Sequence, residues 1–95
     1  MRAYQSQNTD DIMIIRRSKF LTLVQTAITN REFQFVRQAC LIWMASYPGD
    51  LLVNFIYASA LVELGDTEMA LATLERLLRF DPEFTEALSL YSRLS

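Results

Sequence analysis

Apolar residues recur at helical spacing along most of the chain, in five segments that polar or proline-containing turns separate. Residues 1–8 are mostly polar and show no such period, so the sequence predicts a flexible N-terminal arm there and a single helical-repeat domain over residues 9–95. A first helix is expected at about residues 10–28, where apolar side chains fall on one face. These are Phe20, Leu23, Val24, Ala27 and Ile28.

The second segment has the same spacing and is expected to end near Pro48, because proline disfavours helix in the residue before it. Thr29 and Glu32 have the spacing of a capping box, in which side chain and backbone satisfy each other's free groups, and so predict the start of this helix. Its apolar stripe includes Val36, Cys40 and Trp43.

The third segment, residues 51–64, is apolar on nearly every side and predicts a central buried helix with Asp50 as its N-cap. Gly65 then supplies a left-handed stop, and Asp66 caps a fourth helix over residues 67–80. The two helix pairs end at Pro48 and Pro82, which lie 34 residues apart. This interval is typical of a helical-hairpin repeat.

The segment after Pro82 is apolar on one side only, along Phe84, Ala87, Leu88, Tyr91 and Leu94. A stacked array exposes its terminal apolar face unless a polar-backed helix covers it, so this fifth helix is predicted to be a cap. The alternative is that the chain was cut from a longer protein, one helix into a further repeat.

Residues 51–84 carry a set of side chains at positions where one family pattern expects comparable residues, and they resemble the tetratricopeptide repeat (TPR). The set is Tyr57, Ala58, Leu61, Gly65, Asp66, Ala70, Leu74 and Pro82. Residues 17–50 match more loosely, and residues 85–95 would open a third unit. The resemblance implies an all-α fold, a TPR-like right-handed α-α superhelix of two helical hairpins plus a C-terminal capping helix, with about two and a half repeats.

Charge and composition narrow the range of partners. Nine basic and eleven acidic residues give a net charge of −2, so no general attraction to nucleic acid or to an anionic membrane is expected. The N-terminus lacks the apolar stretch of a secretory signal, and no apolar run is long enough to cross a bilayer. Cys40 is the only cysteine, and its apolar surroundings favour a buried structural thiol. We therefore expect a cytoplasmic protein.

The residues needed for common active sites are missing. There is no histidine, one cysteine and no glycine-rich phosphate loop, so catalysis is not expected and no cofactor is implied. Glu63, Asp66 and Glu68 lie near one turn, but helix capping and surface solvation explain them more simply than a metal site does. We expect neither an enzyme nor a metal-binding protein.

The resemblance also implies a concave groove, lined by the first helix of each repeat. Its residues here would be Leu21, Gln25, Ile28, Leu52, Phe55, Ser59 and Val62. Because these are mainly apolar or neutral, an amphipathic partner helix is favoured over a carboxylate group, with Phe55 as the central anchor. The same residues could instead be covered by the N-terminal arm or by a second subunit.

The sequence thus favours a non-enzymatic protein-protein interaction module, an adaptor or small chaperone that binds a partner helix or peptide. A homodimer is possible, because two and a half repeats bury little surface compared with the three or more that such arrays need. The alternative is a structural repeat fragment of a larger regulatory or scaffolding protein, self-associating with no ligand of its own. Phe35 lies off the Val36, Cys40 and Trp43 stripe, and is expected to face solvent, the arm or a neighbouring chain.

Overall fold

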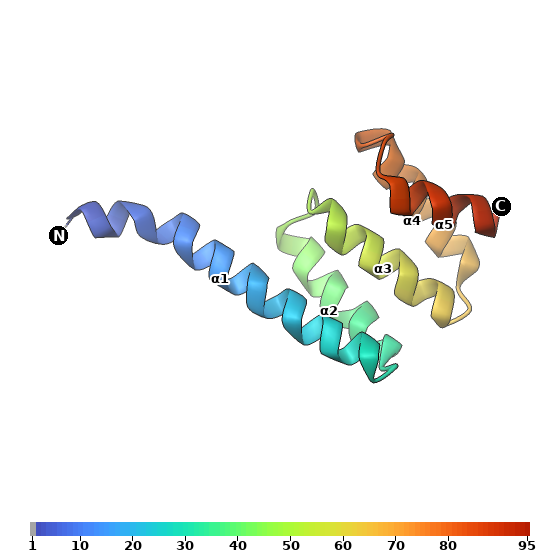
Figure 1. Cartoon of the computed structure of the whole chain (residues 1–95), viewed down its shortest axis with the longest axis horizontal. Coiled ribbons are helices and arrows are strands. Elements are labelled where there is room, and N and C mark those ends of the chain that lie inside the picture. The colour runs from blue at the N-terminus through green and yellow to red at the C-terminus, as the bar shows by residue number, and fades with distance from the viewer. Residues whose placement is uncertain (1) are drawn as a thin grey trace. The chain divides into compact units, whose positions relative to one another are not determined.

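The computed structural model describes residues 2–95, with side chains from residue 12 onward, and all of the regular structure in that range is helical (Figure 1). The predicted all-α class is confirmed. The chain forms two compact units, residues 1–31 and residues 32–95. The helices are α1 (Arg2–Thr29), α2 (Phe33–Ser46), α3 (Leu51–Glu63), α4 (Thr67–Phe80) and α5 (Thr85–Leu94).

The first unit consists of α1, which has 28 residues and begins at Arg2. Residues 2–8 are therefore helical. The predicted division into a flexible N-terminal arm over residues 1–8 and one domain over residues 9–95 stays a prediction. Val24 and Ala27 are buried as expected. Leu23, which was predicted on the same face, is instead exposed, because it lies about 100° around the helix from Val24.

The predicted capping box between α1 and α2 is wrong. The Thr29 hydroxyl donates to the Gln25 carbonyl oxygen, 3.1 Å away and one turn back in its own helix. Glu32 is the N-cap of α2, and no side chain caps that helix end. The chain leaves α1 through Arg31, whose φ of 59° lies in the left-handed region. The turn between the two helices is thus formed by backbone conformation and not by reciprocal side-chain capping.

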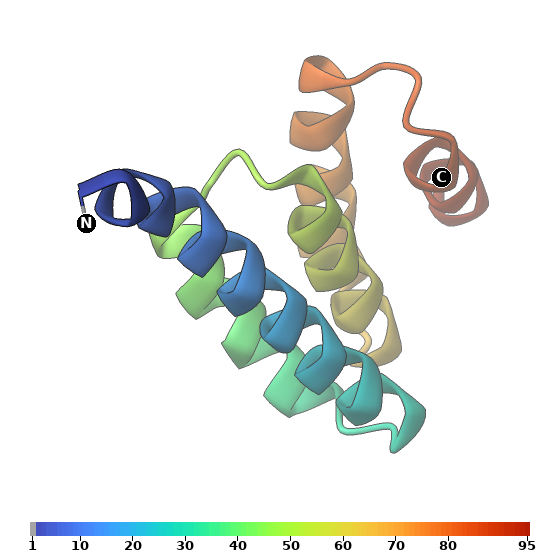
Figure 2. The same cartoon turned by 60° about the vertical axis from the view of Figure 1, so that its left-hand side comes forward.

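In the second unit, α2 and α3 form the first pair of neighbouring helices, side by side in both views (Figures 1 and 2). α2 buries Val36 and Cys40, with Trp43 half-buried, which confirms the predicted stripe. Phe35 lies off that stripe and is exposed, as expected. The helix ends at Ser46, before the Pro48 turn.

A group of polar side chains connects the turn between α2 and α3 to α4. Asp50 was predicted to cap α3, but its carboxylate accepts the indole N–H of Trp43 at 2.9 Å, and α3 has no side-chain cap. Asn54 is 3% exposed. Its Nδ2 donates to the carbonyl oxygens of Pro48 (3.2 Å) and Asp50 (2.9 Å), and its Oδ1 accepts from Nη2 of Arg76 (3.2 Å). This buried amide therefore joins the turn to both helices of the following hairpin.

The turn between α3 and α4 follows the sequence prediction closely. Gly65 has a φ of 88°, a left-handed value that glycine adopts without steric cost. The N–H of Asp66 donates to the Leu61 carbonyl oxygen (2.8 Å) and that of Gly65 to the Val62 carbonyl oxygen (3.0 Å), the pair of bonds of a Schellman motif. Oδ1 of Asp66 then accepts the N–H of Met69 at 3.2 Å, which caps α4 as predicted.

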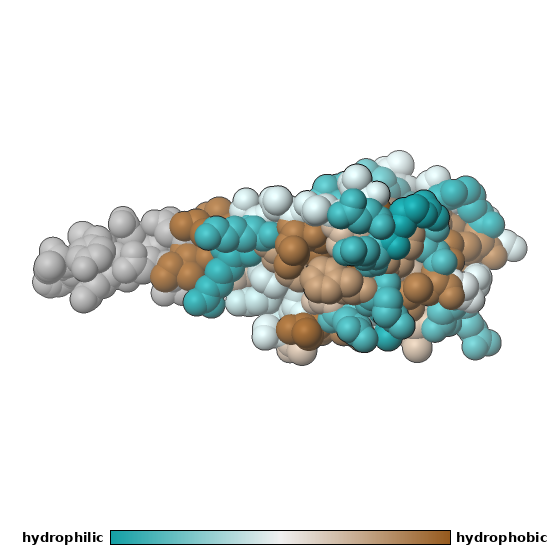
Figure 3. Space-filling model, turned by 90° about the horizontal axis from the view of Figure 1, so that it is seen from below, coloured by the Kyte–Doolittle hydropathy of each residue, from teal (hydrophilic) through white to brown (hydrophobic). Residues whose placement is uncertain are grey.

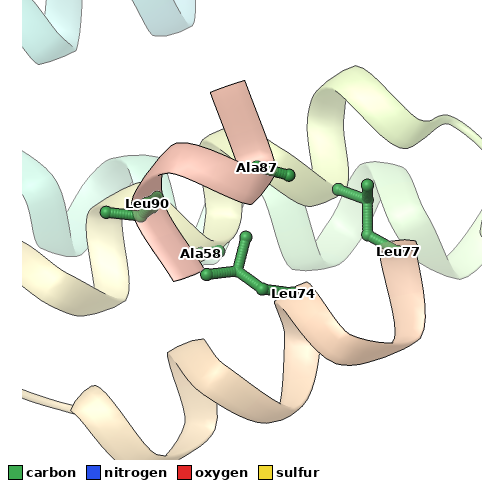
Figure 4. Close-up of a cluster of buried hydrophobic side chains, with 5 residues drawn as sticks. All are labelled: Ala58, Leu74, Leu77, Ala87 and Leu90. Atoms are coloured by element: carbon green, nitrogen blue, oxygen red, sulfur yellow. The ribbon is translucent and has the colours of Figure 1, made fainter. Parts of the chain in front are cut away.

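The core that holds α3, α4 and α5 together is a cluster of small and branched apolar side chains that converge from the three helices (Figure 4). Its buried members are Ala58, Leu74, Leu77, Ala87 and Leu90. The two alanines leave little side-chain bulk at their positions, which lets the backbones of α3 and α5 approach the leucines of α4. This packing fixes the position of α5 against α3 and α4 within the second unit.

The buried face of α5 differs from the prediction at one position. Leu90 is buried in the core cluster, whereas Leu88, predicted to face inward, is 43% exposed. Ala87 is buried, and Tyr91 half-buried, as expected. The Tyr91 hydroxyl donates to Oε2 of Glu75 on α4 at 3.0 Å, which raises the pKa of the Tyr91 phenol because the bond favours its protonated form. The rest of the exposed α5 surface is polar.

Candidate protein-binding face

Four of the predicted groove residues lie on one side of α3. Leu52, Phe55, Ser59 and Val62 are three or four residues apart, so they form a single longitudinal face of the helix, called the α3 face below. Leu52 is 39% exposed and the other three are half-buried. The opposite side of α3 is buried. Its side chains are Val53, Tyr57, Ala60 and Leu61.

Phe55, the predicted central anchor, is partly engaged inside the second unit. Its ring centroid lies 5.6 Å from that of Phe84, with the ring planes at 30°, and both rings pack against the core cluster. Val62 packs against the same cluster. Leu52 does not pack against the core cluster, and it is the most exposed apolar side chain of the α3 face. Phe55 therefore contributes to the core packing as well as to the α3 face, while Leu52 is exposed to solvent.

The other three predicted groove residues belong to α1, in the first unit. Leu21 and Ile28 are half-buried and Gln25 is exposed. Their spacing of four and three residues places them on one face of α1, as the prediction requires. A groove that joins this face to the α3 face stays a prediction.

A hollow that the sequence did not indicate lies within the second unit, beside the turn between α3 and α4. It has a volume of about 260 Å³, and its lining residues are Gln34, Arg37, Leu61, Leu64 and Asp66. Nε of Arg37 donates to Oε1 of Gln34 at 2.7 Å, which orients the guanidinium along one wall. Because its walls come from α2 and from the following hairpin, no single stretch of sequence shows the hollow in advance.

The one thiol has no reactive character. Cys40 is fully buried, and this burial, with a smaller contribution from the negative charge of Asp50, raises the pKa of its thiol to about 12. A thiol with that pKa stays protonated at neutral pH and is a poor nucleophile. Among the residues with described side chains, no three His, Cys, Asp or Glu groups are arranged to hold a metal ion. None of the described helices combines the length and apolar character of a membrane span.

Consecutive helices that pack pairwise, a Schellman turn inside the hairpin and a proline-containing turn after it define the second unit as an α-helical repeat structure. More specifically, residues 51–94 match the family model of the tetratricopeptide repeat and are called the tetratricopeptide repeat segment below. The resemblance inferred from the residues is confirmed there, and the looser match over residues 17–50 stays a prediction. Comparisons with curated proteins and with solved structures find no match.

Proposed function

We propose that this chain is a non-enzymatic adaptor or small chaperone that binds an amphipathic helix or peptide of a partner protein on the α3 face. The tetratricopeptide repeat segment marks the chain as a protein-protein interaction module. The observation that supports the more specific proposal is the α3 face itself, a line of apolar and neutral side chains that the fold leaves accessible. The cytoplasm suits a chain whose single thiol is buried and reduced.

The chemistry of the α3 face indicates the kind of ligand. An amphipathic helix presents apolar residues three and four positions apart, which matches the spacing of Leu52, Phe55, Ser59 and Val62. The second unit carries nine acidic and four basic residues. Basic residues flanking the apolar stripe of the ligand would therefore speed its approach and favour it over an acidic helix.

Leu52 is the position at which to test this proposal, because it is exposed and stands outside the core cluster. Amphipathic helical peptides would be selected from a display library on the wild-type chain, and their affinities measured by titration calorimetry. Leu52→Asp should weaken the selected peptides about tenfold or more, since an apolar contact becomes a desolvated charge. Ile42→Asp, on the exposed side of α2, is the matched control and should bind like the wild type.

Two outcomes would contradict the proposal. One is that no peptide is enriched, which would favour a structural repeat with no ligand of its own. The other is that selected peptides bind Leu52→Asp as tightly as the wild type. Phe55→Asp is a poor probe, because loss of the Phe84 contact would disturb α5 along with the binding face.

A further inference from the structure

One exposed face of α1 combines apolar and basic side chains. Its members follow each other at helical spacing and are called the basic face below: Ile12, Ile15, Arg16, Lys19 and Leu23. All five are exposed, and Ile15 and Leu23 are each 52% exposed. At 100° per residue they span about a quarter of the helix circumference, and the buried Val24 and Ala27 lie outside that sector. In Figure 3 apolar and hydrophilic residues adjoin where the coloured surface begins.

This face is unusual for a solvent-exposed helix surface. Three large aliphatic side chains lie along one stripe, and a soluble chain rarely leaves such a stripe in water without a use for it. Residues 12–31 contain four basic residues and no acidic one. A surface complementary to the basic face would therefore be both apolar and negatively charged.

The same chain carries a surface of the opposite charge. Residues 1–31 hold five basic and two acidic side chains, a net charge of +3, whereas residues 32–95 hold four basic and nine acidic ones, a net charge of −5. Every copy of the protein thus offers a basic unit and an acidic unit. Opposite net charges attract two copies and favour the encounter of unlike units.

Within the acidic unit, the turn between α3 and α4 has the matching chemistry. Leu64 and Met69 are 42% and 49% exposed. They belong to residues 63–69, called the acidic turn below, which also contain Glu63, Asp66 and Glu68. Leu64 also lines the hollow of about 260 Å³, together with Leu61 and the polar side chains of Gln34, Arg37 and Asp66. The acidic turn therefore supplies apolar contact and negative charge together.

We infer that the basic face of α1 docks on the acidic turn of a second copy of this chain. An isoleucine of the basic face packs against the exposed Leu64 and Met69, while Arg16 and Lys19 pair with acidic side chains that include Glu68. When two copies exchange this contact reciprocally, the assembly closes as a dimer. No residue of the α3 face takes part in this contact. Experiments can therefore refute the inference without refuting the proposed function, and the reverse.

Light scattering coupled to size exclusion tests this inference on the full chain. The wild type should show a mass above the 11.0 kDa of the monomer in low salt, and the mass should fall toward that value in high salt, which screens the ion pairs. Arg16→Glu with Lys19→Glu should raise the dissociation constant about tenfold or more. A monomeric wild type at every concentration in low salt would overturn the inference.

Second-site rescue identifies the partner surface. Glu68→Lys alone should weaken association, and adding it to the Arg16→Glu, Lys19→Glu variant should restore association. Glu83→Lys is the matched control, since it makes the same charge change at an exposed residue beyond the other end of α4. Rescue by Glu83→Lys but not by Glu68→Lys would overturn the assignment to the acidic turn.

A third measurement separates a second copy from a lipid surface as the occupant of the basic face. Vesicles containing phosphatidylserine should not retain the wild-type chain in a flotation assay at physiological salt. Retention that Arg16→Glu with Lys19→Glu abolishes, together with a monomeric wild type, would show a lipid-binding helix and overturn the inference. Circular dichroism of each variant should match the wild type, because all the substituted side chains are exposed.

Discussion

Replacement of Asn54 by alanine tests how the second unit is held together. The substitution removes the three hydrogen bonds of the amide, which donates to the carbonyl oxygens of Pro48 and Asp50 and accepts from Arg76. These bonds connect α3 with the turn before it and with α4. The Asn54 side chain is 3% exposed, so little water is in contact with it to form replacement hydrogen bonds.

The expected loss in free energy of unfolding depends on the hydrogen bonds that each partner of Asn54 keeps after the substitution. A typical intramolecular hydrogen bond contributes about 1 kcal/mol net, so three bonds give an upper estimate of about 3 kcal/mol. The Asp50 carbonyl oxygen keeps the backbone N–H of Asn54, at 3.0 Å, and Arg76 is exposed and can turn to water. We therefore expect a loss of about 2 kcal/mol, which corresponds to a fall in Tm of about 8–16 °C for a domain of this size.

Thermal unfolding followed by circular dichroism at 222 nm measures this change, and fluorescence of Trp43, the single tryptophan, reports on the turn beside Asp50. Ser59→Ala is the matched control on the same helix. Its hydroxyl makes only a local bond to the Phe55 carbonyl oxygen, so its loss should cost less than about 0.5 kcal/mol. If Asn54→Ala unfolds with the same midpoint as Ser59→Ala, the network contributes nothing and the reasoning is wrong.

Two further predictions concern α5 and the thiol. Leu90→Ala should lower the free energy of unfolding by about 2–4 kcal/mol and Leu88→Ala by less than about 1 kcal/mol, because Leu90 is 6% exposed and Leu88 43%; equal losses in urea titrations would contradict the α5 packing. Burial raises the pKa of Cys40 from 9.0 to about 12, so between these values the unfolded chain releases a proton that the folded chain keeps. Stability should therefore be full below pH 9 and fall as the pH rises toward 12. Cys40→Ala should show a smaller fall in the urea midpoint between pH 8 and pH 11, and an identical fall would refute the shift.

Much of the fold was predictable, because local signals decide it. Gly65 and Asp66 act within a few residues of their own positions, and the turn and cap they predict are both present. The fourth helix was predicted over residues 67–80, the range that α4 occupies. Where backbone conformation and a nearby side chain set the outcome, periodicity and capping chemistry are sufficient.

Most of the failures occur where a distant group competes for the same atom or face. The capping box at Thr29 is the exception, because its hydroxyl bonds the Gln25 carbonyl oxygen one turn back in the same helix. Asp50 has the chemistry of an N-cap, but the indole of Trp43, seven residues earlier, takes its carboxylate. In α5 both Leu88 and Leu90 are apolar, so the sequence pattern does not choose between two faces; packing against α4 does. The involvement of Phe55 with Phe84 was equally hidden, because 29 residues separate them. These outcomes depend on tertiary neighbours that a local pattern does not contain.

The proposed binding face raises a related question, which is how one helix would combine stability with the recognition we propose. In α3 the buried side and the proposed binding side are opposite: Tyr57 and Leu61 are buried, while Leu52 is 39% exposed. Phe55 lies on the α3 face and also packs against the core cluster. Substitutions at Leu52 should therefore alter binding without changing the midpoint of unfolding, and substitutions at Leu61 should do the reverse. Only at Phe55 should the two effects appear together, because its ring supports α5 from the same side that a ligand would contact.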